Sequence, residues 1–412
     1  MAPGSLGDDG GGPSHHARLV AEVENLFSDA ATALFDQEPD DVAQFLADFF
    51  VREAAQRRKE KAFTTRVICV SDIHGQRKQL AALWEALTRH MGAELAHTTV
   101  VFLGDYCDRG PDTKGVIDWL IELRRTHSAP VHFIAGNHDF GFAAFLGCLP
   151  PSPVDLDATK SPKYNTDLDD PKGFWPHPVA GGMHYQGRRW AEGKVYPSVA
   201  TFRSYGVDFE VEQIVKDGQV EHELFRRLPA AMRPQLLAAV PESHRTFLAQ
   251  LEWLHEQPVT GWGGGISELI CVHAGLDGSK PLAPQLRALR QRDLTDPILY
   301  APPRLGEPVV LDRIEAFSGR TELFPSHPEN ADTCVQVSGH HGVSMESGNR
   351  IILDRSGGKG KLPLEALILP ERWVVASDGT MRRLTAEPFG SNERRVRKEL
   401  EKAALAVHGV TH

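Results

Sequence analysis

The sequence predicts an α/β fold, and three observations lead to that prediction. Short apolar runs alternate with helical patterns over residues 66–137. Asp72, Asp105 and Asn137 each follow one of these runs, at intervals of 33 and 32 residues. Such intervals are typical of successive strand–helix–strand units, and the carboxyl ends of parallel strands meet at one edge of a sheet. We therefore expect the three polar side chains to lie close together.

The composition is that of a soluble globular protein. Of the 412 residues, 41% are hydrophobic and 24% are charged, with a formal net charge of −10. This acidic balance argues against a broad nucleic-acid-binding face, but it allows a local pocket for phosphate. No apolar run approaches the roughly 18–20 residues that span a bilayer, so no membrane partner is expected. The five cysteines contain no CxxC pair, and we interpret Cys69, Cys271 and Cys334, which lie in predicted buried strands, as small hydrophobic residues of a reducing compartment.

The N-terminal part divides into a tail and a helical hairpin. Residues 1–16 are rich in Gly, Pro, Ser and Asp, which predicts disorder. Apolar residues then recur at helical spacing over 17–62, with a break at Pro39. The apolar stripe of this hairpin has two interpretations: it packs against the rest of the chain, or it docks a partner.

Strand and helix patterns continue over 63–388, which we predict to be one domain. Residues 140–262 mix helical pieces with aromatic and basic clusters, and we interpret them as an inserted cap. Residues 389–412 are predicted to form a charged helical tail. Short apolar runs predict strands at 67–70, 100–103, 131–134, 269–272, 333–337, 351–353, 366–369 and 373–376.

Six side chains form a candidate metal centre. Asp72 and His74 alternate along an extended segment, so both point to one side and suit one ion. Asp105 is suited to bridge two ions, because a carboxylate can span two cations. Oxygen and imidazole ligands without a thiolate suit divalent Mn, Fe or Zn. The predicted ligands are Asp72, His74, Asp105, Asn137, His273 and His340.

The final ligand has a competitor in the sequence. His341 directly follows His340 in SGHHG, so either imidazole could serve. We choose His340 because it follows Gly339 at the end of a predicted strand.

Three more residues suit phosphoryl transfer. His138 is next to the ligand Asn137, so its side chain points elsewhere and can act as a general acid. Asp108 is its predicted orienting partner. Arg109 offers a planar two-donor fork for phosphate oxygens. Because two divalent ions clamp the attacking and leaving oxygens of a phosphoryl displacement, the sequence predicts a metal-dependent phosphoester hydrolase.

The motifs SDIHG, GDYCDRG, GNHD, VHAG and SGHHG, in this order, resemble those of the calcineurin-like metallophosphoesterases. Arg109 and the Asp108–His138 pair favour the phosphoprotein phosphatase branch. MHYQGRRWA and TFRSYGV extend the resemblance to the plant Rhizobiales-like phosphatases. The resemblance implies a four-layer α-β-β-α sandwich with a dinuclear centre, in the cytoplasm or nucleus. It also implies phosphotyrosine hydrolysis by a metal-bridging hydroxide, with His138 as the acid.

A phosphotyrosine pocket must be deep, and we expect the long insert to form its walls. The competing interpretation for each insert residue is ordinary packing or a solvated face. The substrate-contact candidates are Arg109, Tyr185, Arg188, Arg189, Arg290 and Arg320.

Three other functions stay open. The same centre could act on a dinucleoside polyphosphate or another small phosphoester. It could also act on phosphoserine and phosphothreonine. The third is a non-catalytic adaptor that binds phosphopeptides.

Overall fold

The computed structural model describes residues 41–149, 184–216, 219–226, 231–301, 313–320 and 326–398, together with residue 400 and short pieces between 23 and 39. The chain divides into two compact units, Met1–Thr64 and Thr65–His412. The tail predicted at 1–16 and the last twelve residues of the predicted C-terminal tail lie outside the described residues.

The first unit contains the long helix α2, Val42–Phe63. Asp41 caps it, because its carboxylate accepts a hydrogen bond from the backbone N–H of Gln44 at 3.0 Å. Residues 26–28 and 30–35 are also helical. The ring of Phe27 meets that of Phe50 edge to face, with centroids 5.5 Å apart.

The first sheet of the second unit has the order β13-β12-β11-β1-β2-β3. Strands β1, β2 and β3 are parallel, whereas β11 runs antiparallel to β1. Strands β1, β2 and β12 form here because their runs are short, apolar and rich in β-branched residues. The bounds are β1 Val67–Val70, β2 Thr99–Phe102, β3 Val131–Phe133, β11 Glu365–Leu369, β12 Trp373–Ala376 and β13 Met381–Arg383.

The second sheet has the order β6-β7-β8-β10-β9, and its strands β7, β8 and β10 are parallel. The sequence did not predict β6, β9 or β13, because none of them carries an apolar run. The bounds are β6 His255–Pro258, β7 Glu268–Cys271, β8 Cys334–Ser338, β9 Ser344–Ser347 and β10 Arg350–Leu353.

The side chains of β1 alternate between two buried clusters. Val67 and Cys69 pack against apolar residues of the second sheet, so the two sheets face each other. Ile68 and Val70 pack instead in a cluster that includes residues of the helices α3, Arg77–Met91, and α4, Thr113–Thr126.

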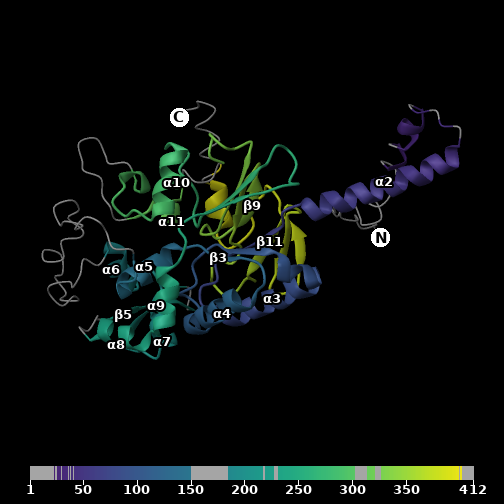
Figure 1. Cartoon of the computed structure of the whole chain (residues 1–412). Coiled ribbons are helices and arrows are strands. Elements are labelled where there is room, and N and C mark those ends of the chain that lie inside the picture. Colours follow the sequence, from purple (N-terminus) through teal and green to yellow (C-terminus); the bar gives the residue numbers. More distant parts are fainter. Residues whose placement is uncertain are drawn as a thin grey trace, which may run out of the picture. The chain divides into compact units, whose positions relative to one another are not determined.

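The outer face of the second sheet is covered as well. Val396, in the helical segment 393–398, packs with Val343, Met345 and Ile352. Figure 1 shows α3 and α4 on one side of the strands and α10, Leu282–Gln291, on the other. The predicted mixed α/β sandwich is therefore confirmed.

The predicted insert, residues 140–262, contains helices and a β-hairpin that the sequence did not predict, and its last part also includes β6 of the second sheet. Its elements are α5 Asn137–Leu146, which begins at a predicted metal ligand, α6 Tyr185–Glu192, α7 Val199–Ser204, β4 Val211–Lys216, β5 Gln219–Phe225, α8 Met232–Ala239 and α9 Glu242–Ala249. Short helical turns elsewhere are η1 Gly92–His97, η3 Pro297–Leu299 and α11 Glu315–Ser318. Residues 150–183 lie outside the described part. No described helix is both long and apolar enough to cross a membrane.

Candidate active site

Three neighbouring parallel strands bring polar side chains to one edge of the first sheet. Asp72 follows β1, Asp105 follows β2, and Asn137 opens helix α5 after β3. All three are buried. The Asp105 carboxylate accepts a hydrogen bond from the backbone N–H of His138 at 3.0 Å, so the first turn of α5 faces it. The loops that follow the strands therefore converge at Asp105.

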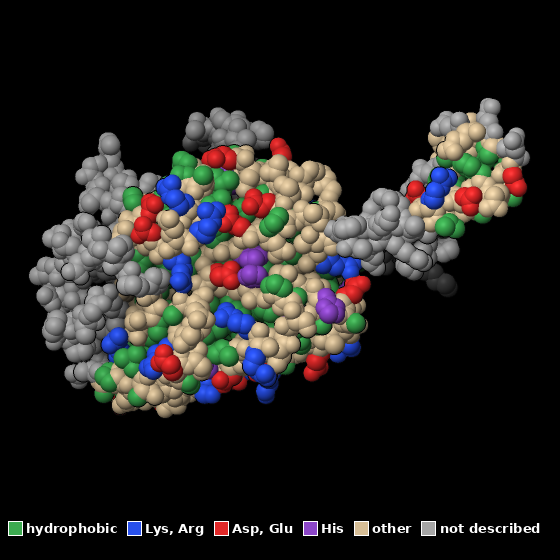
Figure 2. Space-filling view, viewed as in Figure 1, with side chains coloured by type: hydrophobic (Ala, Val, Ile, Leu, Met, Phe, Trp, Pro, Cys, Tyr) green, Lys and Arg blue, Asp and Glu red, His purple; other side chains and the backbone are tan. Residues whose placement is uncertain are grey.

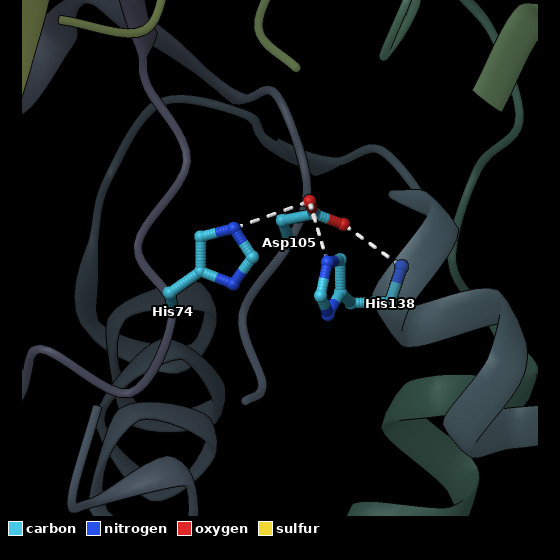
Figure 3. A group of neighbouring side chains, drawn as sticks. All are labelled: His74, Asp105 and His138. Carbon is cyan, nitrogen blue, oxygen red and sulfur yellow. Dashed lines mark hydrogen bonds and ion pairs between the residues drawn. The ribbon is translucent and has the colours of Figure 1, made fainter. Parts of the chain in front are cut away.

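Asp105 lies between two imidazoles in the first donor cluster. His74 and His138 flank its carboxylate, one from the loop after β1 and the other from α5 (Figure 3). The Nε2 atoms of His74 and His138 are 3.3 and 4.0 Å from Asp105 Oδ2. Asp72 Oδ2 lies 4.0 Å from His74 Nε2. One ligand atom each of His74, Asp105 and His138 lies within 4.8 Å of the others, close enough to share one ion.

A second donor cluster shares Asp105 and adds His273 and His340. His273 Nε2 lies 3.4 Å from Asp105 Oδ2 and 3.3 Å from Asn137 Oδ1. The backbone N–H of His340 donates to the Asp72 carboxylate at 3.1 Å. This bond holds the loop that follows β8 at the site. The neighbouring His341 points elsewhere, with its Nε2 atom 2.8 Å from the carbonyl of Ala274.

The histidine orientations fit a metal centre. The Nδ1 atoms of His74 and His273 donate to the carbonyls of Cys107 and Leu103, at 2.8 and 2.7 Å. Nε2 of each ring is therefore turned toward Asp105, as in histidines held by an outer acceptor while they bind a metal. The buried Nε2 atom of His340 has no hydrogen-bond partner. A divalent cation would satisfy these donor atoms, so the residues present fit the predicted cofactor.

Buried negative charge dominates the electrostatics of the centre. Burial and the nearby Asp354 carboxylate raise the pKa of Asp72 well above its usual value. Burial lowers the pKa of His273, but the carboxylates of Asp105 and Asp72 outweigh it and raise that pKa to about 10. A proton on His273 therefore neutralises part of the negative charge of Asp105 and Asp72. A bound divalent cation would neutralise the same charge.

Asp354 is a site residue that the sequence reasoning missed. Its buried carboxylate accepts backbone N–H groups from Gly342 at 2.6 Å and Gly357 at 3.1 Å. Burial raises the pKa of Asp354 to about 6. The sequence does contain a feature that could have identified Asp354. It directly follows the predicted strand in RIILD, just as the other carboxylates of the site follow their strands.

The carboxylate of Asp108 holds His138. Oδ2 of Asp108 is 2.6 Å from His138 Nδ1. The same carboxylate accepts hydrogen bonds from Trp190 Nε1 at 2.9 Å and Thr201 Oγ1 at 2.7 Å. All four side chains are buried. The sequence reasoning missed this role of Trp190 and Thr201, because nothing in α6 and α7 shows that their donors converge on one distant carboxylate.

A further missed carboxylate, Asp139, joins two loops of the site. Its oxygens accept hydrogen bonds from the backbone N–H groups of Tyr106 at 2.8 Å and Gly136 at 3.0 Å. These loops carry Asp105 and Asn137, so Asp139 fixes their spacing.

The guanidinium group of Arg109 reaches over the first cluster. Its Nη1 donates to His74 Nε2 at 2.6 Å, and its Nη2 donates to His138 Nε2 at 3.1 Å. Arg320 lies nearby and donates to the carbonyl of His340 at 2.8 Å. Burial and the neighbouring charges of Arg395 and Arg109 lower the pKa of Arg320 to about 10. Guanidinium groups close enough to repel each other favour a bound anion between them.

The other substrate-contact candidates are placed differently. Arg290 forms a two-point ion pair with Glu256, at 2.7 and 2.9 Å, and its side chain is 58% exposed. This surface pair occupies the Arg290 guanidinium in the structure, and a contact of Arg290 with substrate stays a prediction. Arg189 lies near Tyr196, whose ring meets that of His138 edge to face at 4.8 Å. The side chains of Tyr185 and Arg188 lie outside the described residues.

The backbone of the site is strained. Among the described residues, seven that are not glycine have a positive φ, and five of these are candidate site residues. Such conformations cost of order 1–3 kcal/mol each and cluster at functional sites. The five are His74, Asp105, Asp108, Arg109 and His340, with φ between 46° and 71°.

Comparisons with known proteins found a family model and several similar proteins. Residues 65–215 match the family model described as calcineurin-like phosphoesterase. Serine/threonine-protein phosphatase PP2A-like PPG1 of Saccharomyces cerevisiae is 30% identical over 105 residues, which cover 24% of this chain and 27% of the relative. Serine/threonine-protein phosphatase 2B catalytic subunit A2 of the same yeast is 29% identical over 153 residues. This match covers 32% of this chain and 24% of the relative. The match thus spans about a quarter of each relative's length.

One similar solved structure is the cold-active protein-tyrosine phosphatase of a psychrophilic Shewanella species. The alignment covers 78% of this chain and 80% of that one, with 16% identity and a TM-score of 0.37.

Proposed function

We propose, from the calcineurin-like phosphoesterase pattern of residues 65–215, that this chain is a metal-dependent phosphatase acting on phosphotyrosine in proteins. The observation that carries the proposal is the pair of donor clusters sharing Asp105, in which His138 of the first cluster also pairs with Asp108 and Arg109 lies beside it. This arrangement combines metal ligands, an oriented acid and an anion-binding fork.

The proposed metal ligands are Asp72, His74, Asp105, Asn137, His273 and His340. Divalent ions bound by such ligands supply Lewis acidity and lower the pKa of water. Their fit rests on the convergence of buried carboxylate and imidazole atoms and on the unpartnered Nε2 of His340.

Arg109 is proposed to bind the phosphate. Its two terminal nitrogens already approach both donor imidazoles of the first cluster, so its fork points at the metal site from the outside. Arg109 is exposed at the site rim, which allows it to meet an incoming phosphate. Arg320 is proposed as a second, half-buried source of positive charge.

His138 is proposed to donate the proton that the leaving oxygen needs. Asp108 fixes its Nδ1 side, so Nε2 is the atom that faces Asp105 and Arg109. Protonation of a leaving group by a positioned side chain typically contributes about 10²–10⁴-fold in rate.

The insert supports a preference for a phenolic substrate. Trp190 and Thr201 contact the carboxylate that holds His138, and Tyr196 contacts the His138 ring. The insert therefore lies at the proposed acid, where it can shape the entrance for an aromatic leaving group. Arg189 near Tyr196 adds positive charge on the same side.

The test is hydrolysis of matched phosphotyrosine, phosphothreonine and phosphoserine peptides, with diadenosine tetraphosphate alongside. The chain is first reconstituted with Mn²⁺, Fe²⁺ or Zn²⁺, and His138→Ala is the control. We expect phosphotyrosine to be cleaved fastest and His138→Ala to lose most of the rate. Faster cleavage of the other peptides or of the nucleotide would retain the chemistry and reject the substrate. No turnover with any metal would favour the phosphopeptide adaptor.

A further inference from the structure

A third donor cluster lies apart from the candidate active site. It consists of His132 on β3, Glu252 after α9, and His255 at the start of β6. One ligand atom of each side chain lies within 4.8 Å of the others. None of the three belongs to the proposed catalytic set, and the cluster has no part in the chemistry proposed above.

We propose that His132, Glu252 and His255 bind a single divalent transition-metal ion of the zinc class. The Nδ1 atoms of His132 and His255 are 2.9 and 3.5 Å from the two oxygens of the Glu252 carboxylate. Metal–ligand distances near 2.0–2.1 Å place adjacent ligands of a tetrahedral ion about 3.3 Å apart. The two separations lie on either side of that value but run to different carboxylate oxygens, and one ligand atom of each residue lies within 4.8 Å of the others, so side-chain movements would bring the three ligand atoms around one ion.

The hydrogen bond of His255 supports this assignment. Its Nε2 atom lies 3.2 Å from Gln257 Oε1, which accepts the ring proton there. In the neutral ring, the Nδ1 lone pair then faces the Glu252 carboxylate. A cation between the two donor atoms, or a second proton on the ring, removes the repulsion between these lone pairs. An outer acceptor on the far ring nitrogen is also how proteins orient metal-binding histidines.

The exposure of the cluster leaves room for a fourth ligand. His255 is 7% exposed, His132 26% and Glu252 38%. On the face shown in Figure 2, histidine and acidic side chains meet at the surface over the region where Figure 1 labels β3. Two imidazoles and one carboxylate with water in the open position form a ligand set that zinc accepts.

The ion would join the edges of the two sheets. β3 is the edge strand of the first sheet and β6 the edge strand of the second. Glu252 already lies beside β3, because its backbone N–H donates to Phe133 O at 2.9 Å. A metal there would add a link between the sheets, so its binding should stabilise the fold.

The experiment uses the metal-free full-length chain and Zn²⁺ alone as the probe. Bound zinc is counted by elemental analysis after equilibrium dialysis. We expect Glu252→Gln and His255→Ala each to bind one zinc ion fewer than the unaltered chain. Glu252→Gln keeps the backbone pairing with β3 and is nearly isosteric, so circular dichroism should show an unchanged fold. His90→Ala, which removes an exposed histidine of α3, is the matched control and should change nothing.

Cobalt separates this cluster from the catalytic centre. In the variant His273→Ala, adding Glu252→Gln should remove the part of the visible Co²⁺ absorption that the third cluster contributes and leave the part from the remaining catalytic ligands. Zinc should also raise the thermal midpoint of the unaltered chain more than that of Glu252→Gln. An equal zinc count and equal midpoint shift in both proteins would overturn the proposal, whatever phosphatase activity they show.

Discussion

The Nδ1 atom of His138 lies 2.6 Å from Oδ2 of Asp108, and both side chains are buried. Trp190 and Thr201 complete the surroundings of that carboxylate. The imidazole therefore has one nitrogen fixed by the protein interior and the other directed at the donor clusters. The proposed acid is held by an insert helix as well as by the strand-end loops.

Replacing Asp108 should remove the carboxylate that holds the imidazole of His138 in place. We expect Asp108→Asn to lower kcat by about 10²–10⁴-fold, the range typical for loss of positioned acid–base catalysis. Trp190→Phe removes one donor to Asp108 but keeps the ring, so it should lower kcat only about tenfold. Steady-state kinetics on one phosphopeptide compares the variants. Equal kcat for Asp108→Asn and the unaltered chain would contradict the assigned role.

Arg109→Lys should weaken phosphate binding. Lysine keeps the charge but loses the planar fork, so we expect KM to rise by about tenfold or more. The matched control is Arg290→Lys, whose side chain is occupied by Glu256 at the surface, and KM there should stay within about twofold. A similar KM change in both variants would show that Arg109 has no special role.

Removal of divalent metal should abolish activity and lower stability. Asp72, Asp105 and Asp354 are buried together, and without a cation their repulsion is less well neutralised. A ligand present at a concentration of about 100 times its Kd raises the free energy of unfolding by about 2.7 kcal/mol, which thermal unfolding measures readily. Added Mn²⁺ or Zn²⁺ should restore both properties, whereas His340→Ala should recover poorly. A chelated protein that keeps full activity would exclude the metal mechanism.

The thiol of Cys148 should react slowly at neutral pH. Burial raises its pKa from 9.0 to about 11, so the reactive thiolate is scarcer than usual below that pH. At pH 8 the thiolate fraction should be about a hundredfold lower than for an unperturbed thiol, and it should rise steadily toward pH 11. Mass spectrometry after timed alkylation measures this. Rapid labelling of Cys148 at pH 8 would contradict the expected shift.

The sequence could predict those parts of the site that follow strong strand signals. The apolar runs before Asp72, Asp105 and Asn137 become β1, β2 and β3, and their ends meet because parallel neighbours align. The choice of His340 agrees with the geometry, since His341 turns to the Ala274 carbonyl.

Contacts between distant segments could not be predicted in the same way. The hydrogen bonds of Trp190 and Thr201 to Asp108 depend on how the insert folds back, which no local pattern records. Strand β6 starts with His255 and ends at Pro258, so it lacks the apolar alternation that signals a strand. The pairing of Arg290 with Glu256 could not be predicted, because a basic residue shows its charge in the sequence but not its partner.

The position of β1 has a consequence for synthesis of the protein. One side of β1 pairs with β2 soon after both strands emerge, but the other side pairs with β11, Glu365–Leu369. At about 5–20 residues per second, that edge stays open on the ribosome for roughly 15–60 s. An open strand edge invites pairing with other chains, so the nascent protein should need chaperones until β11 is made. A chain truncated before Glu365 should aggregate even though it contains all six proposed ligands.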